Sequence, residues 1–220
     1  FTGRSEELVR AAEESAAVTH RHPRAIAGTV VVALAIAELA AAATPPDAAA
    51  FAGGLAEAAG RYDSPLADAI RRLPHLLGAD PDQALDLLGT SGYVLHTVPA
   101  ALYCFLRSPG SFRDTVCLAA SAGGDTDTIA AIAGALSGAL NGVEAIPKQW
   151  LEGLERAPGA GRASYVCGLA ASLHQAAITG LQQPRLPLSL ASIGRARVEF
   201  YSLLIVHVLL RIVWRFIPGR

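Results

Sequence analysis

Small residues recur at every fourth position late in this chain, and this spacing limits what the segment can fold into. The repeat consists of Ala130, Gly134, Gly138 and Gly142. Residues four apart are neighbours on the surface of a helix, so the repeat forms one stripe of small side chains that lets a neighbouring helix approach closely. The pattern therefore favours tightly packed helices and predicts one helix from about residue 128 to residue 140.

The rest of the chain supports an all-α fold. It is 52% hydrophobic and 17% charged over 220 residues, which suits one compact domain of many helices with short loops. We find no run of alternating apolar and polar residues that is long enough to predict a β-strand. Helices are predicted over residues 5–18, 24–43, 48–59, 94–107, 112–120, 128–140 and 163–179, with short ones opening at Asp80-Pro81-Asp82 and Ile146-Pro147. The segment 24–43 is almost entirely apolar and is predicted to be too buried to be a surface element.

The composition changes after residue 182. We expect residues 1–182 to form the helical domain, and residues 183–220 to form a linker and an apolar or amphipathic tail helix at about 200–217. The uninterrupted apolar run in this tail is shorter than the ~20 residues needed to cross a bilayer. Three interpretations stay open for the tail: a membrane-surface helix, a helix that meets a partner or covers a groove, or a segment without function.

The net charge and the cysteine content limit the classes of function and the cellular compartment that we expect. A formal net charge of −1 argues against general nucleic-acid binding. Cys104, Cys117 and Cys167 are odd in number and widely spaced, so we expect buried free thiols in a reducing, cytoplasmic setting. The first fourteen residues do not resemble a signal peptide. The chain contains no methionine, from which we expect a fragment or a processed form.

The sequence Gly-Gly-Asp-Thr-Asp-Thr at positions 123–128 places two carboxylates and two hydroxyls directly before the helix with the small stripe. Oxygen atoms of Asp and Thr are the ligands that Mg²⁺, Mn²⁺ and Ca²⁺ prefer. The same residue types are also favoured as simple helix N-caps. From these residues alone, both interpretations stay open.

Several motifs resemble the ADP-ribosylglycohydrolase family, which includes the dinitrogenase reductase-activating glycohydrolases and the ADP-ribosyl-acceptor hydrolases. They are Thr19-His20, Ser91-Gly92-Tyr93-Val94 with Thr97-Val98-Pro99, and Gly123 to Thr128 running into Ile129-Ala130-Ala131-Ile132-Ala133-Gly134. The resemblance covers about residues 5 to 180. It implies an all-α fold, two Mg²⁺ or Mn²⁺ ions, and hydrolysis of the glycosidic bond between ADP-ribose and a protein side chain or small acceptor.

The resemblance also implies roles for individual residues. It implies that Asp125, Asp127 and Thr128 are metal ligands. It implies that His20, Gly92, Tyr93, Gly123 and Gly124 contact the substrate. Two alternatives remain from the residues themselves: His20 could be an exposed turn histidine, and Tyr93 could be a packed core tyrosine. Gly92 and Gly123 are expected to permit close backbone approach.

Three earlier elements of the family do not occur in this sequence. They are a G-D-x-x-G segment, a T-D-D-T-type run with further metal ligands and a catalytic acidic residue, and a G-N-G-x-x-M-R-like loop. We therefore interpret the chain as the C-terminal portion of a family member, identify no catalytic residue in it, and expect the catalytic acid upstream of Phe1. Alone, it is expected to be inactive as a hydrolase. The alternative is a non-catalytic helical module that binds ADP-ribose or a partner.

Overall fold

The computed structural model describes residues 5–156, 162–184, 186, 194 and 198. These residues contain helices and no strand, which confirms the all-α prediction. The chain divides into two compact units, 1–146 and 147–220. The sequence-based boundary after residue 182 stays a prediction, and the predicted tail helix at 200–217 lies outside the described residues.

The first unit holds most of the helices. They are α1 (Ser5–Ala17), α2 (Pro23–Ala41), α3 (Ala48–Gly60), α4 (Ser64–Arg71), α5 (Leu73–Leu76), α6 (Pro81–Leu88), α7 (Val94–Arg107), α8 (Phe112–Ser121), α9 (Thr126–Asn141) and the short 3-10 helix η1 (Val143–Ala145). Every predicted helix in this unit is confirmed. The additional helices α4 and α5 lie in a segment for which no prediction was made.

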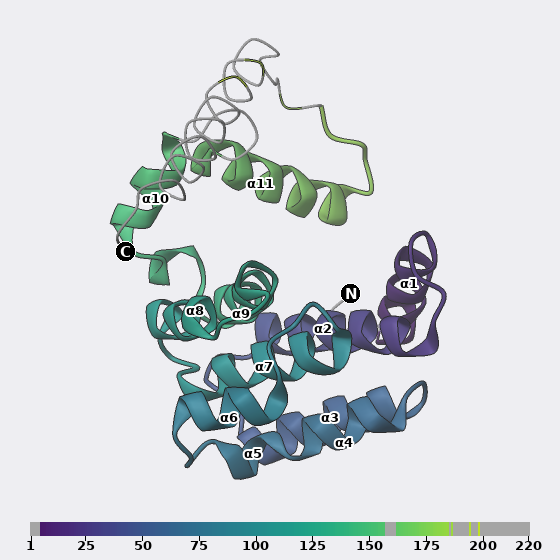
Figure 1. Ribbon diagram of the computed structural model, residues 1–220. Helices are drawn as coiled ribbons and strands as arrows, with labels where there is room; N and C mark the ends of the chain where they lie inside the picture. The colour runs from purple at the N-terminus through teal and green to yellow at the C-terminus, as the bar shows by residue number, and fades with distance from the viewer. Residues whose placement is uncertain (1–4, 157–161, 185, 187–193, 195–197, 199–220) are drawn as a thin grey trace, which may run out of the picture. The chain divides into compact units, whose positions relative to one another are not determined.

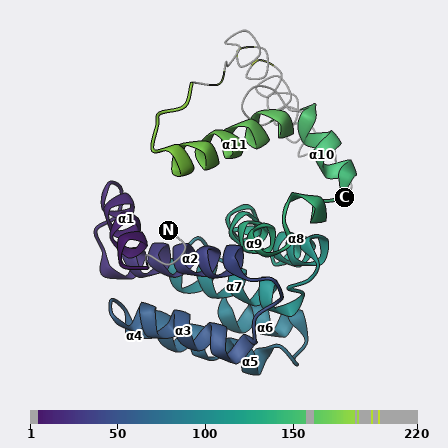
Figure 2. The ribbon, with the colours of Figure 1, turned by 180° about the vertical axis from the view of Figure 1, so that it is seen from behind.

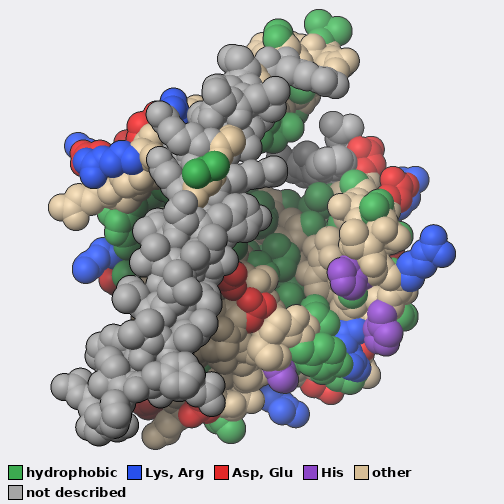
Figure 3. Space-filling model, turned by 45° about the horizontal axis from the view of Figure 1, so that its top comes forward, with side chains coloured by type: hydrophobic (Ala, Val, Ile, Leu, Met, Phe, Trp, Pro, Cys, Tyr) green, Lys and Arg blue, Asp and Glu red, His purple; other side chains and the backbone are tan. Residues whose placement is uncertain are grey.

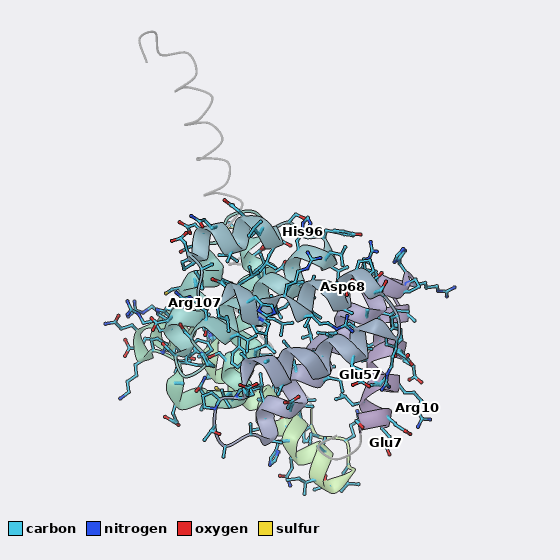
Figure 4. All side chains as sticks on the ribbon, turned by 90° about the horizontal axis from the view of Figure 1, so that it is seen from below. Glu7, Arg10, Glu57, Asp68, His96 and Arg107 are labelled. Carbon is cyan, nitrogen blue, oxygen red and sulfur yellow. The ribbon has the colours of Figure 1, made fainter. Side chains whose placement is uncertain are left out.

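These helices form layers around α7. Helices α3, α4 and α5 make one layer, and α8 and α9 make another. Helices α2 and α7 lie between these two layers (Figure 1 and Figure 2). Ten consecutive residues of α7, Thr97–Leu106, are buried, which places this helix at the centre of the core. Charged side chains such as Arg10, Glu57 and Asp68 stand at the surface (Figure 4).

Two members of the stripe of small residues, Gly134 and Gly138, face α8. A Cβ added to Gly134 would lie 3.3 Å from Val116 Cγ2, and one added to Gly138 would lie 3.8 Å from Phe112 Cε2. The predicted close approach of a neighbouring helix is therefore confirmed, and α8 is that neighbour. This packing fixes the direction of α9 and so the position of its first turn.

Helix α2 differs from the prediction because only part of it is buried. Its inward positions, among them Val31, Ala35 and Leu39, pack against α3, α7 and α9, whereas Thr29 and Glu38 are exposed. The apolar composition misled the prediction, because apolar side chains can also line a pocket. Among the described helices, α2 alone is long and apolar enough to span a membrane, a property that core helices share.

The second unit contains α10 (Lys148–Glu155) and α11 (Ala163–Thr179), both of which the sequence predicted. Glu155 links them by accepting hydrogen bonds from the backbone N–H and the hydroxyl of Ser164, each 2.8 Å long. These bonds, the backbone one first, lower the pKa of Glu155.

The three cysteines are free, as predicted. Only Cys104 is buried, however, while Cys117 and Cys167 are exposed. The prediction of buried thiols is therefore wrong for two of them, because those two positions fall on outward faces of α8 and α11.

Candidate functional site

The turn before α9 is built from two glycines with positive φ. Gly123 has φ +76° and Gly124 has φ +67°, a conformation that L side chains rarely adopt. The next residue, Asp125, is the N-cap of α9, and its backbone N–H donates to the Thr90 carbonyl oxygen at 2.7 Å. The turn thus ties the start of α9 to the segment before α7.

The Asp125 side chain makes no capping bond to the backbone of α9. Elsewhere in the chain, the N-cap residues Asp47, Asp63 and Ser111 each accept a hydrogen bond from a backbone N–H of the helix that follows. The ordinary capping role therefore does not account for the Asp125 carboxylate, whose Oδ1 is bonded to the Thr128 hydroxyl instead of to a backbone N–H.

The oxygen atoms of Asp125, Asp127 and Thr128 form one cluster. The Thr128 hydroxyl donates to Asp125 Oδ1 at 3.0 Å, and Asp127 Oδ1 accepts the Thr128 backbone N–H at 2.9 Å. Hydrogen bonding with the Asp125 side chain, followed by the bond from the Thr128 N–H, lowers the pKa of Asp127. All three side chains lie in the first turn of α9 or at its N-cap.

This cluster has the chemistry of a divalent cation site, because Mg²⁺ prefers carboxylate and hydroxyl oxygens as ligands. The 3.0 Å between Thr128 Oγ1 and Asp125 Oδ1 is an ordinary hydrogen-bond distance. The described residues contain no group of three or more His, Cys, Asp or Glu side chains that could hold a metal. The cluster therefore offers two carboxylates and one hydroxyl, and other ligands would come from water or other groups.

Tyr93 stands at the start of α7 and is 45% exposed, so it is not a core tyrosine. Its hydroxyl accepts a hydrogen bond from Arg24 Nη1, while Arg24 Nε donates to Asp63 Oδ2 at 2.9 Å. The bonds to Tyr93 and Asp63 raise the pKa of Arg24. The Tyr93 ring also packs edge-on against His96, with 5.5 Å between ring centroids.

A pocket of about 820 Å³ lies beside the cluster, within the first unit. Its apolar lining includes Val32 and Ile36 from α2, Val94 from α7 and Ile132 from α9. Thr19, His20, His22, Arg24, Gly92, Tyr93, Thr97 and Thr128 supply polar groups or backbone around it. Figure 3 shows acidic and histidine side chains exposed on one face of the molecule.

The residues predicted to form the site are brought together in part. His20, Gly92, Tyr93 and Thr128 line this pocket. Gly123, Gly124, Asp125 and Asp127 do not line it, but they lie in the turn that leads directly to Thr128. His20 is exposed, and its Nδ1 lies 2.9 Å from Thr19 Oγ1.

Sequence reasoning missed Arg24, His22 and His96. His22 is the N-cap of α2, where its side chain accepts the Arg24 N–H at 3.2 Å, and Arg24 reaches Tyr93 across the fold. A histidine directly before Pro23 is a local signal for a helix start, because proline is favoured in the first turn. The contact between Arg24 and Tyr93 has no local signal.

Comparison with known proteins identifies the family. Residues 1–182 match the model of the ADP-ribosylglycohydrolase family, and the chain belongs to this family. An uncharacterised protein of Archaeoglobus fulgidus is 40% identical over 66% of this chain and 46% of its own length. ADP-ribosylhydrolase ARH3 of Bos taurus is 34% identical over 44% of this chain and 30% of its own.

A bacterial relative is ADP-ribosylarginine hydrolase Tri1 of Pseudomonas putida, which is 40% identical over 40% of this chain and 24% of its own length. The chain thus spans less than half the length of these curated relatives. The resemblance inferred from the D-T-D-T motif is confirmed at the level of the family.

Proposed function

We propose that this chain contributes part of a metal-dependent site that hydrolyses the glycosidic bond between ADP-ribose and a protein side chain or small acceptor. One observation carries this proposal. The Asp125 carboxylate at the start of α9 makes no hydrogen bond to the helix backbone and lies 3.0 Å from the Thr128 hydroxyl. Membership of the family and relatives named as ADP-ribosyl hydrolases support the reaction type.

Asp125, Asp127 and Thr128 would hold a Mg²⁺ or Mn²⁺ ion, one of the two ions expected in a complete family site. A bound cation supplies Lewis-acid polarisation of a ribose oxygen or of a water molecule. The positive end of the α9 dipole disfavours a cation at this place. The two carboxylates reverse that local field, and Thr128 adds a neutral oxygen ligand.

The pocket beside the cluster is proposed to receive ADP-ribose. Its apolar wall from α2 would exclude water from one side of the ligand, while His20 and Tyr93 would offer polar contacts. Gly92, Gly123 and Gly124 would shape the backbone next to it. We also propose a cytoplasmic location, based on the three free cysteines.

Three protein ligand groups are few for an ion that takes six ligands, and no carboxylate is among the described residues that line the pocket. We therefore expect residues 1–220 alone to bind metal weakly and not to turn over. Incubation with Mn²⁺ and an ADP-ribosylated peptide should release no more ADP-ribose than a Mn²⁺ blank. Release at an enzymatic rate would contradict this expectation.

A second candidate function is binding of ADP-ribose or a partner without hydrolysis. The pocket of about 820 Å³ favours it, because such a cavity can hold a ligand whether or not metal is bound. Calorimetry with ADP-ribose, in Mn²⁺ and in EDTA, separates the two. Binding that requires Mn²⁺ supports the hydrolase site, whereas equal binding in EDTA supports the binding module.

A further inference from the structure

Gly92 and Asp125 are so close that a side chain at position 92 would displace the Asp125 carboxylate from its present position. A Cβ added to Gly92 would lie 2.9 Å from Asp125 Oδ2 and 3.7 Å from its Cγ. Gly92 is not among the described glycines with positive φ, so its backbone conformation does not require glycine. The requirement at this position is space, and the neighbour that needs the space is a carboxylate of the proposed metal cluster.

The turn that carries Gly92 is fixed by its own hydrogen bonds. Ser91 Oγ lies 2.8 Å from His96 Nδ1, and the Thr97 hydroxyl donates to the Ser91 carbonyl oxygen at 2.8 Å. On the other side of Gly92, Tyr93 is held by Arg24, which is itself bonded to Asp63. The turn is therefore anchored to α7 and, through Arg24, to the start of α4.

The backbone at the start of α9 is fixed against the same segment. The Asp125 N–H donates to the Thr90 carbonyl oxygen at 2.7 Å, and a Cβ on Gly124 would lie 2.2 Å from that oxygen. With both backbones held, the Asp125 carboxylate is the movable group at the contact with Gly92. Added volume at position 92 would turn this carboxylate away while leaving the fold intact.

We propose that Gly92 is a positioning residue for the metal cluster. The missing side chain leaves room for the Asp125 rotamer in which Oδ1 lies 3.0 Å from Thr128 Oγ1. The importance of this rotamer for metal binding rests on the proposed function, whereas the packing relationship between Gly92 and Asp125 stands on the geometry alone.

The test compares Gly92→Ala with Gly53→Ala in the full chain. Gly53 is an exposed residue of α3, and a Cβ there would meet nothing within 4 Å. Two readouts are needed: the χ1 rotamer of Asp125, from three-bond NMR couplings in labelled protein, and the Mn²⁺ dissociation constant from calorimetry. We expect G92A to keep a wild-type melting temperature, to change the Asp125 rotamer and to weaken Mn²⁺ binding by about 10-fold or more. G53A should change neither the rotamer nor the affinity.

An unchanged Asp125 rotamer in G92A would overturn the proposal, and so would an unchanged Mn²⁺ affinity beside a wild type that binds Mn²⁺. Loss of the cooperative melting transition in G92A would also overturn the proposal. The added methyl group would then disturb the backbone and not only the Asp125 side chain. If the wild type does not bind Mn²⁺, the metal part of the proposed function fails. The rotamer comparison then still decides the positioning role.

Discussion

The backbone N–H of Asp125 donates to the carbonyl oxygen of Thr90 over 2.7 Å, which joins the first turn of α9 to the segment between α6 and α7. This bond holds the residue just before the Ser91-Gly92-Tyr93 motif against the Gly-Gly-Asp-Thr-Asp-Thr motif, and both are among the motifs that carry the family resemblance. Gly124 packs against the same Thr90 oxygen, so this contact between the two segments leaves no room for a side chain at position 124.

Gly124→Ala should therefore destabilise the protein more than Gly123→Ala. Both positions have positive φ, which costs a non-glycine residue about 1–2 kcal/mol. At position 124 the new Cβ would also collide with the Thr90 backbone oxygen, whereas at position 123 it meets nothing within 4 Å. Urea unfolding of the two variants measures the difference. Equal losses in the free energy of unfolding would contradict the close contact between Gly124 and the Thr90 carbonyl oxygen.

Asp63 has two roles, and Asp63→Ala should cost more stability than Asp47→Ala. Asp47 caps α3 alone, so its loss should cost about 1 kcal/mol. Asp63 caps α4 and also pairs with Arg24 at 2.9 Å, with its side chain only 9% exposed. Its removal should therefore cost about 2–3 kcal/mol, because a partly buried cation loses its partner. Chemical unfolding at neutral pH measures both variants, and similar losses would show that the ion pair adds nothing.

Stability should fall at alkaline pH. Burial raises the pKa of Cys104 from 9.0 to about 12, and burial together with the 2.6 Å hydrogen bond to Glu13 raises the pKa of Tyr62 from 10.0 to about 12. Since both groups are neutral when protonated, the unfolded chain ionises first. Their effect on stability is constant below about pH 9 and is lost between about pH 9 and pH 12.

The slope of unfolding free energy against pH tests this prediction. Cys104 should contribute at most about 1.4 kcal/mol per pH unit above its unfolded pKa. The variant C104A should be less stable overall, but its stability should depend less on pH between about pH 9 and pH 10. An identical slope in C104A would show that the Cys104 thiol ionises as easily in the folded protein as in the unfolded chain.

Thiol labelling should distinguish the three cysteines. Cys117 and Cys167 are exposed and should react with a thiol reagent in the native protein, whereas Cys104 is fully buried and should react only after unfolding. Counting labels by mass spectrometry with and without urea measures this. A third label at native rates would contradict the burial of α7 in the core.

The fold was predicted well where a helix has a long and regular pattern. The predicted ranges 94–107 and 163–179 coincide with α7 and α11 as the structure has them. Helices α4 and α5 are short and were not predicted. Local signals for α4 are present in the sequence, because Asp63 is its N-cap, Pro65 lies in its first turn, and Leu66, Ala67 and Ile70 are buried at helical spacing.

Part of the candidate site could also be predicted from the sequence, and part of it depends on tertiary packing. Asp125, Asp127 and Thr128 fall in one turn, so their proximity could be predicted from sequence alone. Whether Asp125 caps the helix could not be predicted, because that depends on its rotamer and on Gly92, a tertiary neighbour. The pocket likewise depends on how α2 packs, and its apolar sequence suggested full burial instead.

Mn²⁺ binding to the full chain tests the central claim most directly, with D125N and D127N as variants and D82N as the control. Asp82 lies in the first turn of α6, away from the cluster, so it tests the loss of one acidic charge at a helix start. We expect weak, saturable Mn²⁺ binding to wild type and D82N, and its loss in D125N and in D127N. Equal Mn²⁺ affinity in all four proteins, or binding in none of them, would contradict the claim that these residues form a metal site.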